Sequence, residues 1–133
     1  MSHSSEASVR GTVAAAISNS AVRLLADYTG RGPTKAKTIV NRDVVVILLQ
    51  DTMTKAEKTL IANGKTDLVL STRHEFQMAM QKDLVAAVEM LVERKVIAFM
   101  SENHVDPDMA AEVFVLEAEA RKPTEAEASD SST

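Results

Sequence analysis

Residues Val44–Leu49 form an unbroken apolar run, VVVILL, and this run limits the folds open to the chain. A strand with one face in solvent alternates apolar and polar residues, whereas a continuous apolar run indicates burial on both faces in the centre of a sheet. In a small two-layer domain, the chain's own helices can cover only one face of that sheet. A second copy of the chain is the simplest cover for the other face. We therefore predict a homo-oligomer, most simply a dimer.

The residues before this run predict a helix and the first strand of a hairpin. Helical spacing of apolar residues from Ser8 to Tyr28 predicts an amphipathic helix, and Gly30 is well placed to end it with a positive φ. A short strand is expected around Ala36–Val40, and Asn41–Asp43 has the residues of a tight turn. The run VVVILLQ is then the second strand of the hairpin.

The second half of the chain repeats this order of elements. Thr54 and Glu57 have the spacing of a capping box, which predicts a helix start, and Asn63-Gly64 interrupts that helix. A methionine-bearing apolar stripe, typical of a core or interface face, predicts a long helix from Thr66 to about Arg94. We then expect a strand at Val96–Met100, a polar loop at Glu102–Asp108 and a strand at Val113–Leu116, with a bulge or short turn at 108–111.

These elements predict an α+β fold of two layers in the order αββαββ, with a mostly antiparallel four-stranded sheet and helices on one face. A chain of 133 residues suits one domain with one core. We expect a disordered start at residues 1–7, a single domain at 8–117, and a disordered acidic tail at 118–133, where hydrophobicity is low.

Composition narrows the classes of function. The absence of cysteine excludes disulfides and cysteine nucleophiles and suits a reducing, cytoplasmic compartment. The sequence has no signal-peptide pattern and no apolar run of the ~20 residues that span a bilayer, so we expect a soluble protein without direct membrane insertion. Aromatic residues for base stacking are scarce and the net charge is −4, which argues against nucleic acid as a partner.

Charge is distributed unevenly along the chain. From Arg23 to Lys65 there are eight Lys and Arg against four acids, whereas from Thr66 onward six bases face fourteen acids. Such a chain can pair its halves across an interface or present one positive patch. Two ordinary solvated faces and an acidic tail would give the same count.

The basic loop GRGPTKAK is the first candidate site. Its glycines allow close approach of an anion, and its cations supply charge for a phosphate or an acidic partner. It is not a Walker loop, because the glycine spacing differs and the loop follows a helix. A rigid helix-to-strand turn with solvated basic residues is the alternative. The candidate ligand- or partner-binding residues are Arg31, Gly32, Lys35, Lys37 and Arg42.

The loop Ser101–Asp108 is the second candidate. His104, Asp106 and Asp108 are residue types that bind Zn, Mn or Mg or that act in acid–base catalysis. Asp-Pro and Asn are also standard turn residues. We favour a turn with capping carboxylates, and we expect no metal site, no cofactor and no catalytic residues.

Three segments resemble the bacterial MpsC-like domain family: GRGPTKAK, MTKAEKTL and the S-x-N-H-x-D-P-D loop. The similarity covers about residues 10–117. Met53 departs from the family pattern, where leucine is expected, but the two side chains have similar volumes. The resemblance implies a link to a cation-translocating, membrane-potential-generating system associated with inorganic-carbon uptake. It implies no catalytic residues.

Three functions follow as hypotheses. The leading one is a small soluble accessory or regulatory protein, not an enzyme, that forms a homo-oligomer and binds a protein partner, such as a membrane-transport complex. The second is a ligand-sensing module that binds an anionic metabolite at the GRGPTKAK loop. The third is an enzyme that uses the His104–Asp108 loop.

Overall fold

The computed structural model describes residues 2–30 and 35–119, with side chains described from Val9 onward. Its elements follow the predicted order. The second helical region consists of two helices, separated at Asn63-Gly64 as the sequence predicted. The elements are α1 (Ser2–Thr29), β1 (Lys35–Asn41), β2 (Val44–Gln50), α2 (Lys55–Ala62), α3 (Thr66–Val92), β3 (Val96–His104) and β4 (Met109–Leu116).

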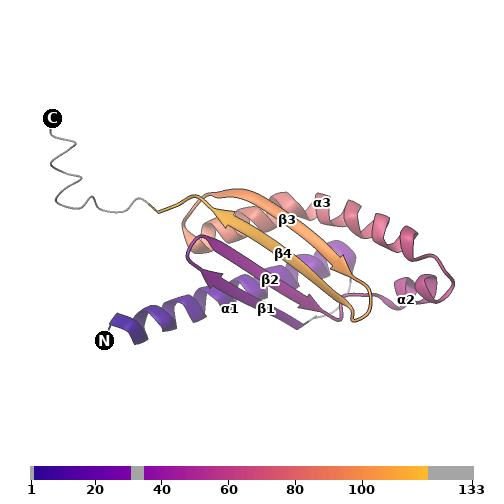
Figure 1. The fold of residues 1–133 in the computed structure, drawn as a ribbon, viewed down its shortest axis with the longest axis horizontal. Coiled ribbons are helices and arrows are strands. Elements are labelled where there is room, and N and C mark those ends of the chain that lie inside the picture. The colour runs from indigo at the N-terminus through magenta and orange to yellow at the C-terminus, as the bar shows by residue number, and fades with distance from the viewer. Residues whose placement is uncertain (1, 31–34, 120–133) are drawn as a thin grey trace.

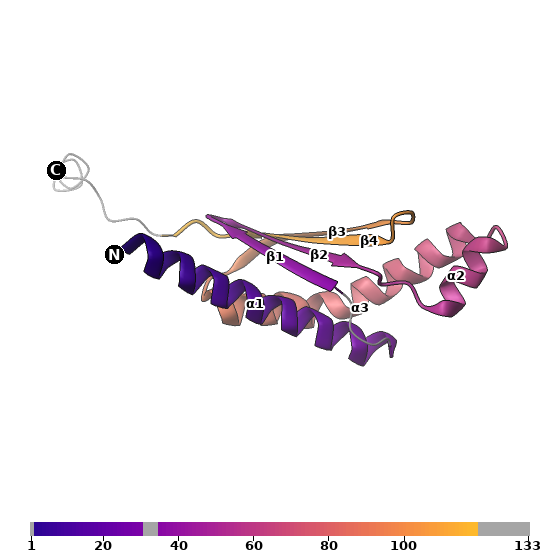
Figure 2. The ribbon, with the colours of Figure 1, turned by 90° about the horizontal axis from the view of Figure 1, so that it is seen from below.

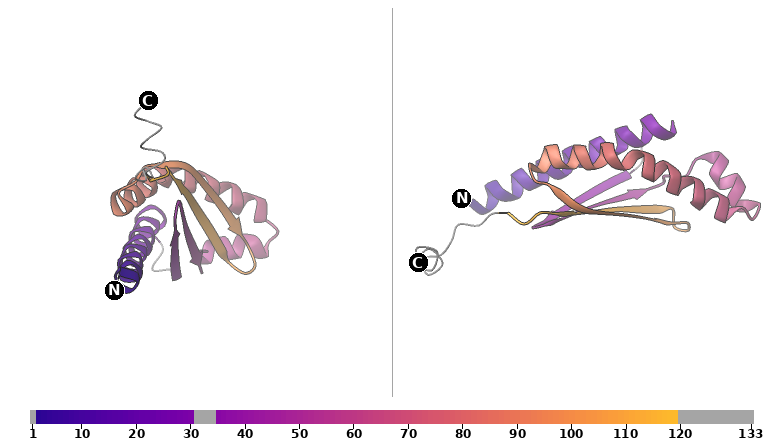
Figure 3. Two further views of the ribbon diagram at one scale, coloured as in Figure 1. Left: turned by 60° about the vertical axis from the view of Figure 1, so that its left-hand side comes forward. Right: turned by 90° about the horizontal axis from the view of Figure 1, so that it is seen from above.

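The four strands form one fully antiparallel sheet in the order β1-β2-β4-β3 (Figure 1). The apolar strand β2 lies between β1 and β4, so its prediction as a central strand is confirmed. Both long helices lie on the same side of the sheet (Figures 2 and 3). The α+β class and the one-sided helix layer are therefore as predicted.

The core lies between this helix layer and the sheet. Ile17 of α1 and Val88 of α3 meet Ile47 and Phe114 of the two central strands. Along β2, buried residues alternate with partly exposed ones. The chain's own helices thus cover one face of the apolar run and leave the other open, as the sequence predicted.

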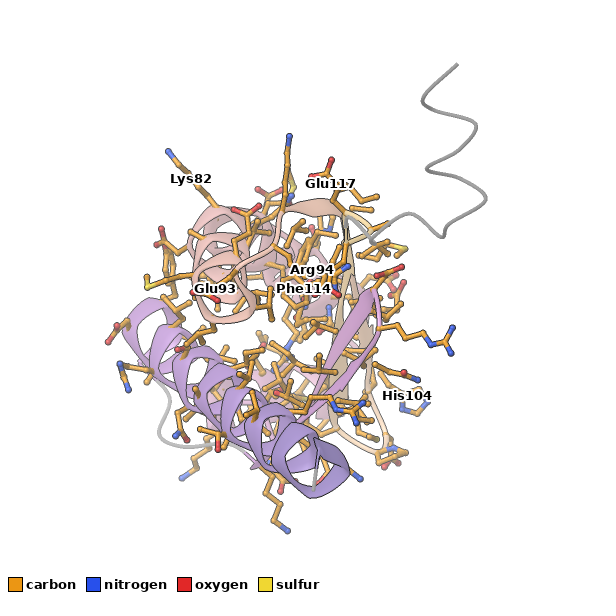
Figure 4. The ribbon with its side chains drawn as sticks, turned by 90° about the vertical axis from the view of Figure 1, so that its left-hand side faces the viewer. Lys82, Glu93, Arg94, His104, Phe114 and Glu117 are labelled. Carbon is orange, nitrogen blue, oxygen red and sulfur yellow. The ribbon has the colours of Figure 1, made fainter. Side chains whose placement is uncertain are left out.

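Arg94 holds the end of the sheet at which the β1–β2 hairpin turns. Its guanidinium donates to the carbonyl oxygens of Arg42 at 2.8 Å and Glu117 at 2.7 Å, and it forms an ion pair with Asp43. Figure 4 shows Arg94 near Glu117, and Phe114 between the sheet and the helices. These bonds join the turn to the residues that follow β4.

The local signals for turns and helix ends are also confirmed. Gly30 and Gly64 have φ of 72° and 78°, the left-handed region that glycine adopts without strain. The Thr54 hydroxyl accepts from the backbone N–H of Glu57, and the Glu57 carboxylate accepts from the N–H of Thr54. This reciprocal pair is the capping box that starts α2.

Three element boundaries differ from the prediction. Helix α1 begins at Ser2 rather than Ser8, strand β3 continues to His104, and β4 begins at Met109. Residues 102–104 were predicted as loop and 109–111 as a bulge or turn; both are strand. Polar residues such as Asn103 favoured a loop in the prediction. In the structure, Asn103 faces the helices and its side-chain amide forms hydrogen bonds with Gln77 of α3, so a polar residue is accommodated within the strand.

Candidate functional site

The sheet face opposite the helices is an array of four rows, which we call the outer face. Because the strands are in register, each row contains one residue from every strand. The residues between these, at every second position of each strand, point to the helices. For example, the hydroxyl of Thr38 in β1 lies 2.7 Å from the hydroxyl of Ser18 in α1. The four rows are Lys35–Gln50–Met109–His104, Lys37–Leu48–Ala111–Glu102, Ile39–Val46–Val113–Met100 and Asn41–Val44–Val115–Ala98.

The outer face is apolar in two of its four rows and charged at its β1 and β3 edges. The last two rows are apolar except for Asn41, and Ile39 and Met100 expose 45% and 54% of their surface. Lys37 on β1 and Glu102 on β3 lie at opposite ends of the second row. With strands about 4.8 Å apart and rows about 7 Å apart, the array covers about 500 Å², of which the two apolar rows make up about half. An exposed apolar patch of a few hundred Å² often marks an interaction site.

The predicted basic site is only partly assembled. Lys35 and Lys37 lie on the outer face at the beginning of β1. Arg42 lies in the hairpin turn at the other end of the same strand, about 16 Å from Lys37 by strand length. Arg31 and Gly32 fall outside the described residues. Anion binding by the GRGPTKAK loop stays a prediction.

The second predicted candidate, the loop before β4, has a structural role. The Asp108 carboxylate accepts from the Thr52 hydroxyl at 2.9 Å and from the backbone N–H of Met53 at 2.8 Å. His104 Nδ1 lies 2.8 Å from the carbonyl oxygen of Pro107. Within residues 2–30 and 35–119, no group of three or more His, Cys, Asp or Glu is placed to hold a metal ion.

A cavity of about 250 Å³ lies on the helix side of the sheet. Helices α1, α2 and α3 and strands β2, β3 and β4 all contribute to its walls, which are mostly apolar. Two aromatic residues, Phe76 and Phe99, line it, and Phe99 also packs against Phe114 with ring centroids 5.0 Å apart. The cavity therefore adjoins the hydrophobic core and is separated from the outer face by the sheet.

Glu112 of β4 is the unusual residue in this cavity. Only 5% of its surface is exposed, and its Oε2 atom has no hydrogen-bond partner. Burial raises its pKa from 4.5 to about 7, although the hydroxyl of Ser101, opposite it in β3, acts to lower that pKa. At neutral pH this carboxyl group is poised between its neutral and ionised forms.

The other two charged residues that line the cavity neutralise each other. Arg73 of α3 donates from Nε to Glu57 Oε2 at 2.8 Å. Burial alone would raise the Glu57 pKa, but bonds from Arg73 and from the Thr54 backbone outweigh it and hold that pKa below its ordinary value. Arg73 also bonds Asn103, whose amide exchanges two hydrogen bonds with Gln77. Glu112 is left as the unpaired charge of the cavity.

Sequence reasoning missed Glu112. Its signal was present in the segment MAAEVFVL, where Ala110, Glu112, Phe114 and Leu116 share one strand parity. An acid on the parity of buried apolar residues predicts a buried carboxylate. That inference needed the full extent of β4, whose start was predicted four residues too late.

A protein-family model described as "Na+-translocating membrane potential-generating system (MpsC)" matches residues 9–118 of this chain. The chain belongs to the MpsC family. The match covers the described part of the chain almost completely, which confirms the resemblance found in the three sequence segments. No curated protein and no solved structure matches the chain significantly.

The name of the MpsC family refers to a system in a membrane, but this chain has no spanning helix among the residues that the structure describes. The family description assigns no role to Glu112, the outer face or the GRGPTKAK loop.

Proposed function

We propose that this chain is a non-catalytic accessory protein that acts as a homodimer in the cytoplasm and binds a protein partner in a cation-translocating membrane system. The observation that carries the proposal is the outer face, an apolar surface that the chain's own helices leave open. The family description supports the link to the membrane system. Partner binding and compartment rest on that description and on composition.

The charges of the outer face favour a second copy of the chain as its cover. Consider two sheets packed face to face about a two-fold axis that runs parallel to the strands, between β2 and β4. Each β1 then lies over the β3 of the other copy, and each row lies over the same row. Lys37 faces Glu102 of the second copy, and Glu102 faces its Lys37. The interface is self-complementary, as a two-fold dimer requires.

The alternative orientation is less favourable. If the axis ran across the strands, the second row would lie over the third, and Lys37 would face Ile39 of the second copy. The charges would then be buried against apolar side chains without partners, which is costly. Two faces of about 500 Å² bury about 1,000 Å² together, the lower limit for a stable interface. Aligned sheets at about −30° are a common way to pack such faces.

In this dimer the helices point outward and can meet the partner protein. Helix α3 carries exposed apolar side chains there, with Met78 exposed by 58% and Met90 by 76%. Such residues are typical of protein interfaces. We place the partner-binding surface on this helix layer.

A charge-reversal series tests the proposed interface. Lys37→Glu or Glu102→Lys alone creates two like-charge contacts per dimer, and we expect each to weaken dimerisation by about tenfold or more. The double variant restores both contacts with the signs exchanged and should dimerise nearly as tightly as the native chain. Dissociation constants come from sedimentation equilibrium at low salt.

Lys58→Glu, an exposed residue of α2 away from the outer face, is the matched control and should not change dimerisation. If the double variant is no tighter than the singles, the strand-parallel arrangement is wrong.

A further inference from the structure

The cavity beside Glu112 has the features of a binding site rather than of a packing defect. The cavity is partly open to solvent, since Phe76 in its wall is 41% exposed, so a ligand can enter it. It measures about 250 Å³, whereas an apolar cavity of about 150 Å³ accommodates benzene. There is room for one aromatic ring or a short alkyl chain with a polar head group. Phe76 and Phe99 offer apolar and aromatic contacts to such a body.

The polar groups of the cavity select the charge of the head group. Glu57 and Arg73 are already paired, so they contribute no net charge. Glu112 is 95% buried, and its Oε2 has no hydrogen-bond partner. A buried carboxylate oxygen without a partner costs free energy that a hydrogen-bond donor of opposite charge would recover.

We propose that the cavity binds a small apolar molecule carrying an ammonium group, with the Glu112 carboxylate as its counter-ion. Once Glu112 is ionised, as at pH 8, an anionic head group would face like charge and a neutral one would leave the carboxylate uncompensated. The site lies on the helix side of the sheet and does not involve the outer face. The inference therefore stands or falls independently of the dimer.

Three probes with the same body and different head groups test the proposal: 2-phenylethylammonium, 2-phenylethanol and phenylacetate. Isothermal titration calorimetry of the full chain at pH 8 should show the ammonium probe binding at least tenfold more tightly than the other two. Glu112→Gln should weaken the ammonium probe at least tenfold and change the alcohol little. At pH 6 the ammonium probe should displace a proton from Glu112, which makes the observed heat depend on the buffer.

Two further variants separate binding from folding. Ala110→Leu fills the cavity from β4 and should weaken all three probes, with the helix and strand signals of circular dichroism unchanged. Glu75→Gln removes an exposed carboxylate from α3 and should change nothing. The proposal is overturned if the ammonium probe fails to bind the native chain at millimolar concentration, if phenylacetate binds as tightly, or if Glu112→Gln binds the ammonium probe undiminished.

Discussion

At the scale of the residue, Glu112 shows how burial sets the chemistry of a side chain. Its backbone position, between Ala111 and Val113 in β4, is fixed by the sheet and places the carboxyl group among core residues. Desolvation disfavours the charged form, and no cation within the described residues compensates, because Arg73 is engaged by Glu57. A buried carboxyl group without a cation beside it costs free energy that an apolar residue of similar size would not cost.

The raised pKa of Glu112 predicts a loss of stability with rising pH. Between its ordinary pKa of 4.5 and the folded value of about 7, the folded chain binds more protons than the unfolded chain. The free energy of unfolding therefore falls as pH rises through that window, by about 3 kcal/mol in total. Glu112→Gln should remove this fall and exceed the native chain in stability at pH 8. Urea unfolding of both proteins from pH 4 to pH 8.5 measures the difference.

The difference between the two curves of unfolding free energy against pH isolates the contribution of Glu112. Glu57, whose pKa is lowered, loses its stabilising contribution as pH falls, but it does so in both proteins. Parallel curves for native chain and variant would show that Glu112 is ionised in the folded state.

At the scale of the element, one carboxylate joins the β3–β4 hairpin to the segment that precedes α2. Asp108 accepts from the Thr52 hydroxyl and from the Met53 N–H, and both Thr52 and Met53 are buried. Met53 is followed at once by the capping box of α2. The two hydrogen bonds of Asp108 thus position the start of α2. Glu57 of α2 pairs with Arg73 of α3, and both residues line the cavity, so the same bonds help to position one of its walls.

Asp108→Ala should therefore destabilise the fold by about 2 kcal/mol, because two buried donors lose their acceptor. Asp106→Ala, an exposed acid in the same loop, is the matched control and should cost less than about 0.5 kcal/mol. Thermal or urea unfolding checks both variants. Equal effects of the two substitutions would contradict the structural role of Asp108.

Elements with strong local signals were the ones that sequence could predict. The run at Val44–Leu49, the capping box at Thr54 and the glycine at position 30 each depend on neighbours in the chain, and each was placed correctly. The ends of β3 and β4 depend on pairing across the sheet and on bonds to α3, which no local pattern encodes. The cavity was missed for the same reason, since its walls come from six elements.

At the scale of the whole molecule, the fold has two layers, one of helices and one formed by the sheet. One layer of helices covers one face of the sheet and leaves the other face open (Figure 2). The array centred on Val46 and Val113 lies on that open face. A second copy would complete a four-layer arrangement with helices outside and two sheets inside. The sequence predicted that the apolar run needs a second cover, and the structure adds which residues that cover would meet.

The mass of the native chain in solution tests this account most directly. Light scattering coupled to size-exclusion chromatography at micromolar concentration should give about twice the 14.4 kDa of one chain. A mass of 14.4 kDa that persists as the concentration is raised to several hundred micromolar would mean that the outer face has no partner copy, and the proposed dimer would be wrong.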